Sequence, residues 1–315
     1  MATYASKLRP TAVDGSTCRI NHMGQLQANA GMEPFSAGTK DGVPAVFYVD
    51  GNVVSSGRGN SWDSAFKTLA EGLAAAQSYQ STSGNRAWAH RATVYACGDS
   101  LTEDLVILAE KTDVIGVGSC NSLKKCQVIG NHVPVTTTTS GCRFINFQFS
   151  EADAGAMWTL TSVSGGINFI NCDFSVRGAI ATHGILMTAL GYANVIIDGC
   201  YFDAFPNGFT TGAIVVGAGL CDKLVITNNY INSSIGIVIN ASTTNVAGVI
   251  QIDRNVITAT TFCIDDDSAL AIVTNNMMVS SANVGATMYD LNLAKAAGNV
   301  ATGADDTHSV PSIAD

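Results

Sequence analysis

Phe144-Ile-Asn-Phe-Gln-Phe149 is the first of six similar hexapeptides that lie between Cys142 and Val279. The other five are Phe169-Ile-Asn-Cys-Asp-Phe174, Ile197-Asp-Gly-Cys-Tyr-Phe202, Ile226-Thr-Asn-Asn-Tyr-Ile231, Ile252-Asp-Arg-Asn-Val-Ile257 and Val273-Thr-Asn-Asn-Met-Met278. Successive copies start 25, 28, 29, 26 and 21 residues apart. A sequence that recurs with a period of roughly 20 to 50 residues is typical of a solenoid.

A second apolar run keeps pace with the hexapeptide. The runs are residues 157–160, 184–187, 213–216, 236–239, 262–264 and 287–291. Each repeat is therefore predicted to form one rung of at least two strands, with three favoured. Rungs that stack about 4.8 Å apart pair each strand with its equivalents above and below. Positions 1 and 6 of the hexapeptide should then form two ladders of side chains inside the core.

Position 4 of the hexapeptide carries Asn229, Asn255 and Asn276 in the last three copies. Asn tolerates a left-handed backbone and can supply a side-chain hydrogen bond, so we expect a corner there. Stacked amides can also bond to one another along the axis. Cys172 and Cys200 occupy the same position and should continue the column as buried thiols; a disulfide between them is geometrically possible.

An apolar stripe upstream of the repeats predicts an amphipathic helix. Its members recur at steps of four, three, four and three: Trp62, Phe66, Leu69, Leu73 and Ala76. Asn60 or Ser61 is suited to cap its N-terminus, and Asp63 in the first turn favours the helix dipole. A solenoid needs an element that covers its open end, and this helix fits that role.

The chain from Tyr48 to Gly118 resembles a known family. The matching segments are Tyr48-Val-Asp-Gly51, Gly59-Asn-Ser-Trp62, Ala65-Phe-Lys-Thr-Leu69, Ala92-Thr-Val-Tyr-Ala-Cys97, Gly98-Asp99, Leu105-Val-Ile-Leu108 and Asp113-Val-Ile-Gly-Val-Gly118. They resemble the cap and first rung of right-handed parallel β-helix proteins, the pectate-lyase-like superfamily, which includes many bacteriophage surface proteins. The resemblance covers about residues 46 to 295. It implies a fold rather than a function, because the superfamily contains lyases, hydrolases, adhesins and structural spikes.

The expected fold class is thus all-β: a right-handed parallel β-helix with an N-terminal capping helix and an extended arm. The expected parts are an arm at 1–45, a cap at 46–90, the β-helix at 91–295 and a tail at 296–315. The arm shows neither strand alternation nor a helical stripe, so we expect it to order on a partner. No apolar helix remains to cover the C-terminal end, which favours a homo-oligomer; the resemblance implies a trimer.

Composition limits the classes of partner. The net charge is -9 and the pI near 4.9, which argues against binding nucleic acid. No stretch approaches the length of a membrane span, and no signal peptide is visible after Met1. None of the nine cysteines forms a Cys-x-x-Cys pair. Reduced thiols are therefore expected, with assembly in a cytoplasm.

Asp265-Asp266-Asp267 is the one acidic cluster in the repeat region. Asp265 and Asp267 should share one side of a strand, with Asp290 one rung further on. Two carboxylates from among Asp265, Asp267 and Asp290 could serve as a catalytic pair. Asp265, Asp266 and Asp267 could instead form a Ca²⁺ site. The alternative to both is a solvated turn. Thr182-His183-Gly184 resembles a His-Gly element of pectin hydrolases, but the order of the acidic elements differs. No motif for a cofactor appears, and none is expected.

Cations are scarce in the repeats: residues 142–295 contain only Arg143, Arg177, Arg254, Lys223 and Lys295. This supply is thin for binding an acidic polysaccharide. We therefore expect a non-enzymatic structural protein of a bacteriophage virion: a capsid decoration or cement protein, a spike or a tail component. Its arm should contact other virion proteins. The alternatives are a polysaccharide lyase or hydrolase that acts as a tailspike, and an adhesin that binds a cell-surface glycan.

Overall fold

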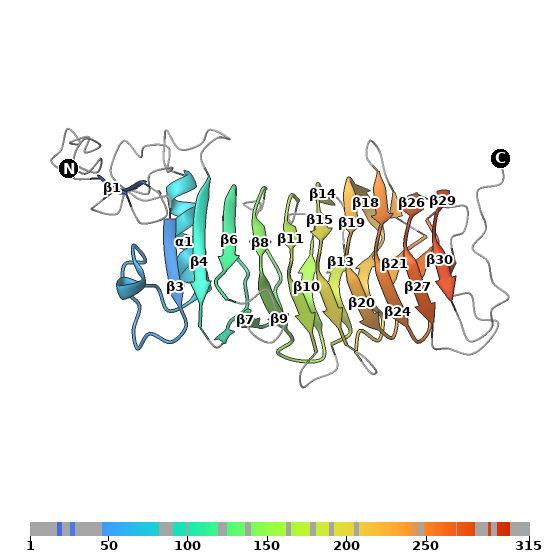
Figure 1. The fold of residues 1–315 in the computed structure, drawn as a ribbon, viewed down its shortest axis with the longest axis horizontal. Helices are drawn as coiled ribbons and strands as arrows, with labels where there is room; N and C mark the ends of the chain where they lie inside the picture. The colour runs from blue at the N-terminus through green and yellow to red at the C-terminus, as the bar shows by residue number, and fades with distance from the viewer. Residues whose placement is uncertain are drawn as a thin grey trace, which may run out of the picture.

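The computed structural model shows a parallel β-helix whose rungs follow one another in sequence order (Figure 1). It describes residues 18–20, 26–28, 46–81, 91–98, 100–118, 125–135, 140–161, 165–176, 181–188, 192–204, 208–241, 243–244, 249–268, 270–280, 289–290 and 295–302. Three long sheets of parallel strands run along the axis, so the prediction of three strands per rung is confirmed. Within the described residues, no helix is long and apolar enough to cross a membrane.

The hexapeptide supplies strands of the first two sheets from Arg143 onward, and earlier strands extend both sheets toward the N-terminus. The first contains β3 (Val46–Asp50), β4 (Ala92–Cys97), β6 (Thr112–Gly116), β8 (Arg143–Ile145), β11 (Asn168–Ile170), β15 (Ile196–Asp198), β19 (Leu224–Thr227), β23 (Ile250–Asp253), β26 (Ala271–Thr274) and β29 (Lys295–Ala297). The second contains β5 (Leu101–Thr102), β7 (Cys126–Ile129), β9 (Phe147–Ser150), β12 (Asp173–Ser175), β16 (Tyr201–Asp203), β20 (Tyr230–Ser233), β24 (Val256–Ala259), β27 (Met277–Ser280) and β30 (Val300–Thr302). Each hexapeptide therefore spans the corner between two sheets.

The second apolar run supplies the third sheet. Its strands are β10 (Ala156–Leu160), β13 (His183–Met187), β17 (Gly212–Val216), β21 (Ile237–Ile239), β25 (Ile264–Asp266) and β28 (Tyr289–Asp290). A smaller parallel sheet was not expected; it consists of β14 (Tyr192–Ala193), β18 (Gly219–Asp222) and β22 (Thr243–Thr244). It precedes the hexapeptides of successive rungs and adds a short fourth side to part of the helix.

Both predicted core ladders are confirmed. Position 1 pairs in register along the first sheet through Phe144, Phe169, Ile197, Ile226, Ile252 and Val273. Position 6 pairs along the second sheet through Phe149, Phe174, Phe202, Ile231, Ile257 and Met278. Every one of these side chains is fully buried. Trp158 of β10 packs between the two ladders, with its ring 5.0 Å from that of Phe144 and 5.2 Å from that of Phe149.

The predicted capping helix is present but begins later than expected. Helix α1 spans Leu69–Ser81, whereas Trp62–Ser64 form a separate short 3-10 turn without a side-chain cap from Ser61. Leu69 and Leu73 are fully buried, and α1 contacts β3 and β4 at the N-terminal end of the stack (Figure 1). The helix starts at Leu69 because Thr68 and Glu71 form a capping box: the backbone N–H of Glu71 donates to Thr68 Oγ1, and that of Thr68 donates to the Glu71 carboxylate.

Two further boundaries differ from the sequence-based prediction. The resemblance implies a strand at Leu105-Val-Ile-Leu108, but the strand of that rung is β5, Leu101–Thr102; Leu105 and Leu108 are buried outside any strand. At the other end, β29 and β30 continue the stack beyond residue 295. Their segment Ala296-Ala-Gly-Asn-Val-Ala301 is a seventh copy whose small apolar residues hid the pattern.

The N-terminal segment contains one feature that sequence did not predict. Strands β1 (Cys18–Ile20) and β2 (Leu26–Ala28) pair antiparallel as a short hairpin. The rest of residues 1–45 and all of residues 303–315 lie outside the described residues. The expectation that the arm and the C-terminal end meet partner chains therefore stays a prediction.

Candidate functional site

The corner between the first two sheets is the most regular polar feature of the described residues. Of the two alternatives expected at position 4, a left-handed backbone or a side-chain hydrogen bond, the structure shows the hydrogen bond, and the left-handed residue lies at position 3. The backbone φ angles there are 62° at Asn146, 51° at Asn171, 63° at Gly199, 56° at Asn228, 55° at Arg254 and 54° at Asn275. The turn at position 3 aims position 4 into the interior. The recurrence of Asn and Gly at position 3 was the available signal, since these residues adopt positive φ most readily.

Position 4 forms a buried ladder of amides in four consecutive rungs. Its members are Asn229, Asn255, Asn276 and Asn299, and none is more than 9% exposed. Nδ2 of Asn255 donates to the carbonyl oxygen of Ile226 at 3.0 Å and to Oδ1 of Asn276 at 2.9 Å. Its Oδ1 accepts from the backbone N–H and Nδ2 of Asn229, at 3.0 and 2.9 Å.

This arrangement satisfies both donors and both acceptor sites of the Asn255 amide. Asn276 repeats the pattern with Ile252 and Asn299, at distances of 2.9 to 3.0 Å. The predicted axial amide ladder is therefore confirmed. Because a buried amide is costly only when its bonds are missing, this polar column stabilises the stack and fixes the register between rungs.

Cys172 and Cys200 extend this column toward the N-terminus, as predicted. Both are fully buried free thiols, so the possible disulfide is not formed. Sγ of Cys200 contacts the carbonyl oxygen of Phe169 at 3.5 Å, the place that an Asn Nδ2 takes in later rungs. The backbone N–H of Cys200 donates to Oδ1 of Asn229 at 2.8 Å, which joins the thiol and amide parts. Burial raises the pKa of the Cys200 thiol well above its usual value.

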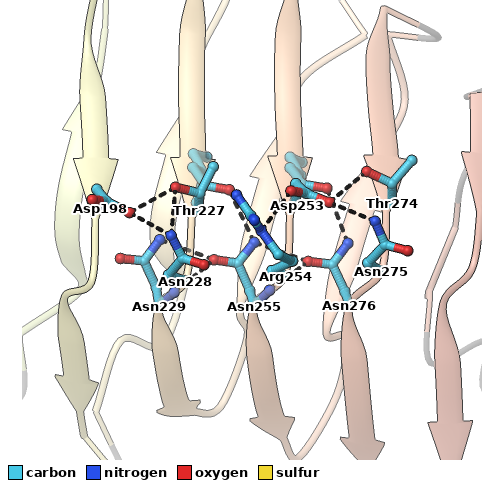
Figure 2. Close-up of polar contacts among 12 residues, drawn as sticks. Asp198, Thr227, Asn228, Asn229, Asp253, Arg254, Asn255, Thr274, Asn275 and Asn276 are labelled. Atoms are coloured by element: carbon cyan, nitrogen blue, oxygen red, sulfur yellow. Dashed lines mark hydrogen bonds and ion pairs between the residues drawn. The ribbon is translucent and has the colours of Figure 1, made fainter.

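A second polar network covers the outside of the same corner (Figure 2). Asp198 accepts hydrogen bonds from Thr227 at 2.7 Å and from Asn228 at 2.8 Å. Two repeats later, Asp253 accepts from Thr274 at 2.7 Å and Asn275 at 2.9 Å.

Asp253 also pairs with the guanidinium of Arg254 at 2.9 Å. Burial by itself would raise the pKa of Asp253, but the bonds from Thr274, Asn275 and Arg254 outweigh it and place the pKa below its usual value. The carboxylate is thus charged at neutral pH and bound to its neighbours in the adjacent rung. Asp253 therefore links its own rung to the next one through Thr274 and Asn275.

The acidic cluster of the third sheet is divided by the fold. Asp266 points inward and is fully buried, with Oδ1 accepting from the backbone N–H and Oγ of Ser268, at 3.0 and 2.6 Å. Asp265 is partly exposed and Asp267 is exposed. Asp265 lies in register with Asp290 on the next strand, as expected. The backbone register therefore makes Asp265 and Asp290 neighbours on adjacent strands, while Asp266 holds the turn that follows β25.

Across the described residues, no three His, Cys, Asp or Glu side chains are placed to hold a metal ion. His183 of the Thr182-His183-Gly184 element lies in β13, and its Nδ1 is 2.8 Å from Oγ1 of the adjacent Thr182. Burial lowers the pKa of His183. The ring is thus engaged locally with the preceding residue.

His132 is a buried titratable group that sequence reasoning missed. Its Nδ1 accepts from the backbone N–H of Leu105 at 3.1 Å, and its ring lies 4.6 Å from that of Trp158. Burial lowers its pKa to about 3, so the ring is neutral at neutral pH. His132 therefore secures the loop that follows β5, and no local sequence pattern marks this role.

Two carboxylates anchor the first rungs. Glu103 accepts the backbone N–H groups of Leu69 and Ala70 at 2.7 and 2.8 Å, which caps α1 from the β-helix. Asp113 accepts from Arg143 at 2.6 Å and pairs with Arg91 at 2.5 Å on the outer face of the first sheet. Burial opposes ionisation of Asp113, but the two guanidinium groups lower its pKa below the usual value.

Comparisons with family models, with curated proteins and with solved structures found no match to this chain. The parallel β-helix is consequently defined by its own strand pairing. The polar residues that the fold brings together at the corner bind one another, and they link each rung to the next. What the corner does chemically is to hold the stack in register.

Proposed function

We propose that the chain is a non-enzymatic structural component of a bacteriophage particle, assembled in the host cytoplasm. In this proposal the β-helix is a stiff outer body, and residues 1–45 attach it to other virion proteins. The particle part is a capsid decoration or cement protein, a spike or a tail component. The proposal draws its phage context from the resemblance of residues 46 to 295 to β-helix proteins of that kind.

The observation that carries the proposal is the unbroken stack from β3 to β29 in one sheet. Nine steps of about 4.8 Å make a body about 43 Å long. Contacts between neighbouring rungs run along this axis in the two apolar ladders, the amide column and the outer carboxylate network. Bending the stack or sliding one rung would therefore break several of these contacts at once. Such a rod suits a mechanical role on the surface of a particle.

Deleting residues 1–45 tests the attachment. We expect the shortened chain to keep the far-ultraviolet spectrum and melting profile of the β-helix, yet to be missing from particles purified after complementation of a phage that lacks the gene. A full-length chain produced in the same way is the control. Normal incorporation of the shortened chain would contradict the proposed role of the arm.

A polysaccharide-cleaving enzyme is the second candidate, and the register of Asp265 with Asp290 favours it. Two carboxyl groups about 5 to 5.5 Å apart suit a retaining glycosidase, and adjacent strands lie at about that spacing. Release of reducing ends or unsaturated uronates from host polysaccharide, lost in Asp265→Ala and in Asp290→Ala, would support this function and refute the non-enzymatic one. A passive adhesin would bind the same glycan without releasing either product.

A further inference from the structure

Position 5 of the hexapeptide forms an outward column on the second sheet. The strands pair in register through Gln127, Gln148, Asp173, Tyr201, Tyr230, Val256, Met277 and Val300. The first three members are polar and the last five are aromatic or aliphatic. We call these five residues, from Tyr201 to Val300, the outer stripe.

In this column the polar side chains are buried and several apolar ones are exposed, which is the reverse of the usual distribution. The polar members are buried, with Gln127 at 8%, Gln148 at 2% and Asp173 at 0% exposure. In the outer stripe, Tyr230 is 40%, Met277 48% and Val300 58% exposed. Apolar surface gains about 25 cal/mol for each Å² removed from water, so an apolar row of this kind marks a contact surface.

We propose that the outer stripe is the face on which a second copy of this chain packs, with the two β-helices lying side by side. The proposal deepens the structural role given above and rests on it, because a self-assembling rod is what that role requires. It names the contact surface of the expected homo-oligomer.

The chemistry of the outer stripe fits a protein surface better than a glycan. Tyr201 and Tyr230 stack on each other, with ring centres 4.9 Å apart and planes at 11°, so each ring already has one face covered by the other. Val256 and Val300 carry no side-chain hydrogen-bonding group for sugar hydroxyls, and Met277 offers only a weak thioether acceptor. A glycan laid along these three residues would lose water from its hydroxyls with little replacement.

The spacing of the outer stripe favours a second copy over an unrelated protein. Its side chains repeat every rung, about 4.8 Å, and so form evenly spaced ridges over a length of about 19 Å. A second β-helix carries ridges with the same period, which lets the two rows interlock along their whole length. That length is shorter than a standard interface, so the outer stripe would be the apolar centre of a larger contact.

Charge points to the same occupant. The chain carries a net charge of -9, so two copies repel wherever their acidic surfaces meet. Among the described side chains at position 7, Asp203 beside Tyr201 is acidic, whereas Asn232, Thr258 and Val279 beside Tyr230, Val256 and Met277 are uncharged. On the corner side, Asp198 accepts from Asn228 at 2.8 Å, and Arg254 pairs with Asp253 at 2.9 Å. The part of the outer stripe from Tyr230 to Met277 is therefore one where two acidic copies can approach with little repulsion.

The test is the association of the full-length protein, measured by sedimentation velocity over a range of concentrations. Met277→Glu places a charge in the centre of the outer stripe, and we expect it to raise the concentration of half-association on the order of a hundredfold. Ile272→Glu is the matched control: Ile272 is 37% exposed on the first sheet of the same rung. We expect this control to associate as the unaltered chain does.

A monomeric unaltered chain, or loss of association in Ile272→Glu but not in Met277→Glu, would overturn the proposal. If Met277→Glu does not fold, oxidation of the unaltered chain by peroxide still tests whether the outer stripe is the contact face. Its Met277 should be oxidised by peroxide several-fold more slowly above the association midpoint than below it, while buried Met278 stays unreactive. A constant rate at Met277 overturns the proposed face. The proposed function fails separately, through normal incorporation without residues 1–45.

Discussion

Replacing Asn255 with Leu tests whether the buried amide ladder stabilises the β-helix. Leu is close to Asn in shape at the branch point but has no donor or acceptor. The change removes the only acceptor found for the backbone N–H and for one Nδ2–H of Asn229. It also removes the donor to the carbonyl oxygen of Ile226. The backbone N–H of residue 255 keeps its bond to Oδ1 of Asn276.

The magnitude follows from these losses. Two buried N–H groups without an acceptor cost about 1–3 kcal/mol each. Burying a Leu side chain returns about 1.5–3 kcal/mol. We therefore expect Asn255→Leu to lower the free energy of unfolding by about 2 kcal/mol, although a simple count of apolar area would predict a gain.

Equilibrium unfolding in urea, followed by circular dichroism and by tryptophan fluorescence, to which the buried Trp158 contributes, measures the change. Coincidence of the two signals is needed, because rungs of a solenoid can unfold separately. Cys200→Asn is the opposite change at the same position of an earlier rung. Its amide can reach the carbonyl oxygen of Phe169 and Oδ1 of Asn229, so its stability should change by less than about 1 kcal/mol. An Asn255→Leu variant as stable as the unaltered chain, or a strongly destabilised Cys200→Asn, would refute the reasoning.

Three further predictions address single contacts. Because the pKa of His132 is about 3 in the fold and about 6.5 when unfolded, the unfolded chain binds the proton first, and this residue lowers stability by about 1.4 kcal/mol per pH unit as pH falls from 6.5 toward 3. Urea unfolding of His132→Phe at pH 7.5, 6 and 5 should lack that part of the slope; an unchanged slope contradicts it. Glu103→Ala should cost about 1–2 kcal/mol and speed amide exchange at Leu69 and Ala70, whereas equal exchange rates would contradict the cap. Gly199→Asn should keep the melting temperature, because φ is 63° and an added Cβ meets no atom closer than 4.0 Å, while Gly199→Val should lower it; equal effects would contradict this reading of the corner.

The sequence alone predicted the solenoid, because the features that define it are local and repeated. Positions 1 and 6 are apolar in every copy, as Phe169 and Phe174 are in the second and Ile252 and Ile257 in the fifth. The seventh copy escaped notice because Ala296 and Ala301 are too small to stand out from neighbouring loops. The capping box of Thr68 and Glu71 was legible in the sequence, since a Ser or Thr followed three residues later by Glu is a known helix start.

Other features depended on where the corner falls. Both position 3 and position 4 are rich in Asn, and the Gly residues at position 3, such as Gly199, are the one sequence signal for which of the two takes the positive φ. The structure places the turn at position 3, as at Asn228, and so assigns the buried amide to Asn229. The separation of Asp266 from Asp265 was expected from alternation along a strand, whereas only the structure shows that it is Asp266 that is buried.

The sequence by itself determined the period, the core ladders and the need for a cap, because these follow from apolar residues recurring at fixed spacing. Only the tertiary structure decided which distant residues meet: Glu103 with the first turn of α1, His132 with Leu105, and Tyr201 with Tyr230. Those contacts join residues 27 to 34 positions apart in the chain. Their formation depends on the register between rungs, which is set by the turns and loops that join the strands, and not by any short stretch of sequence.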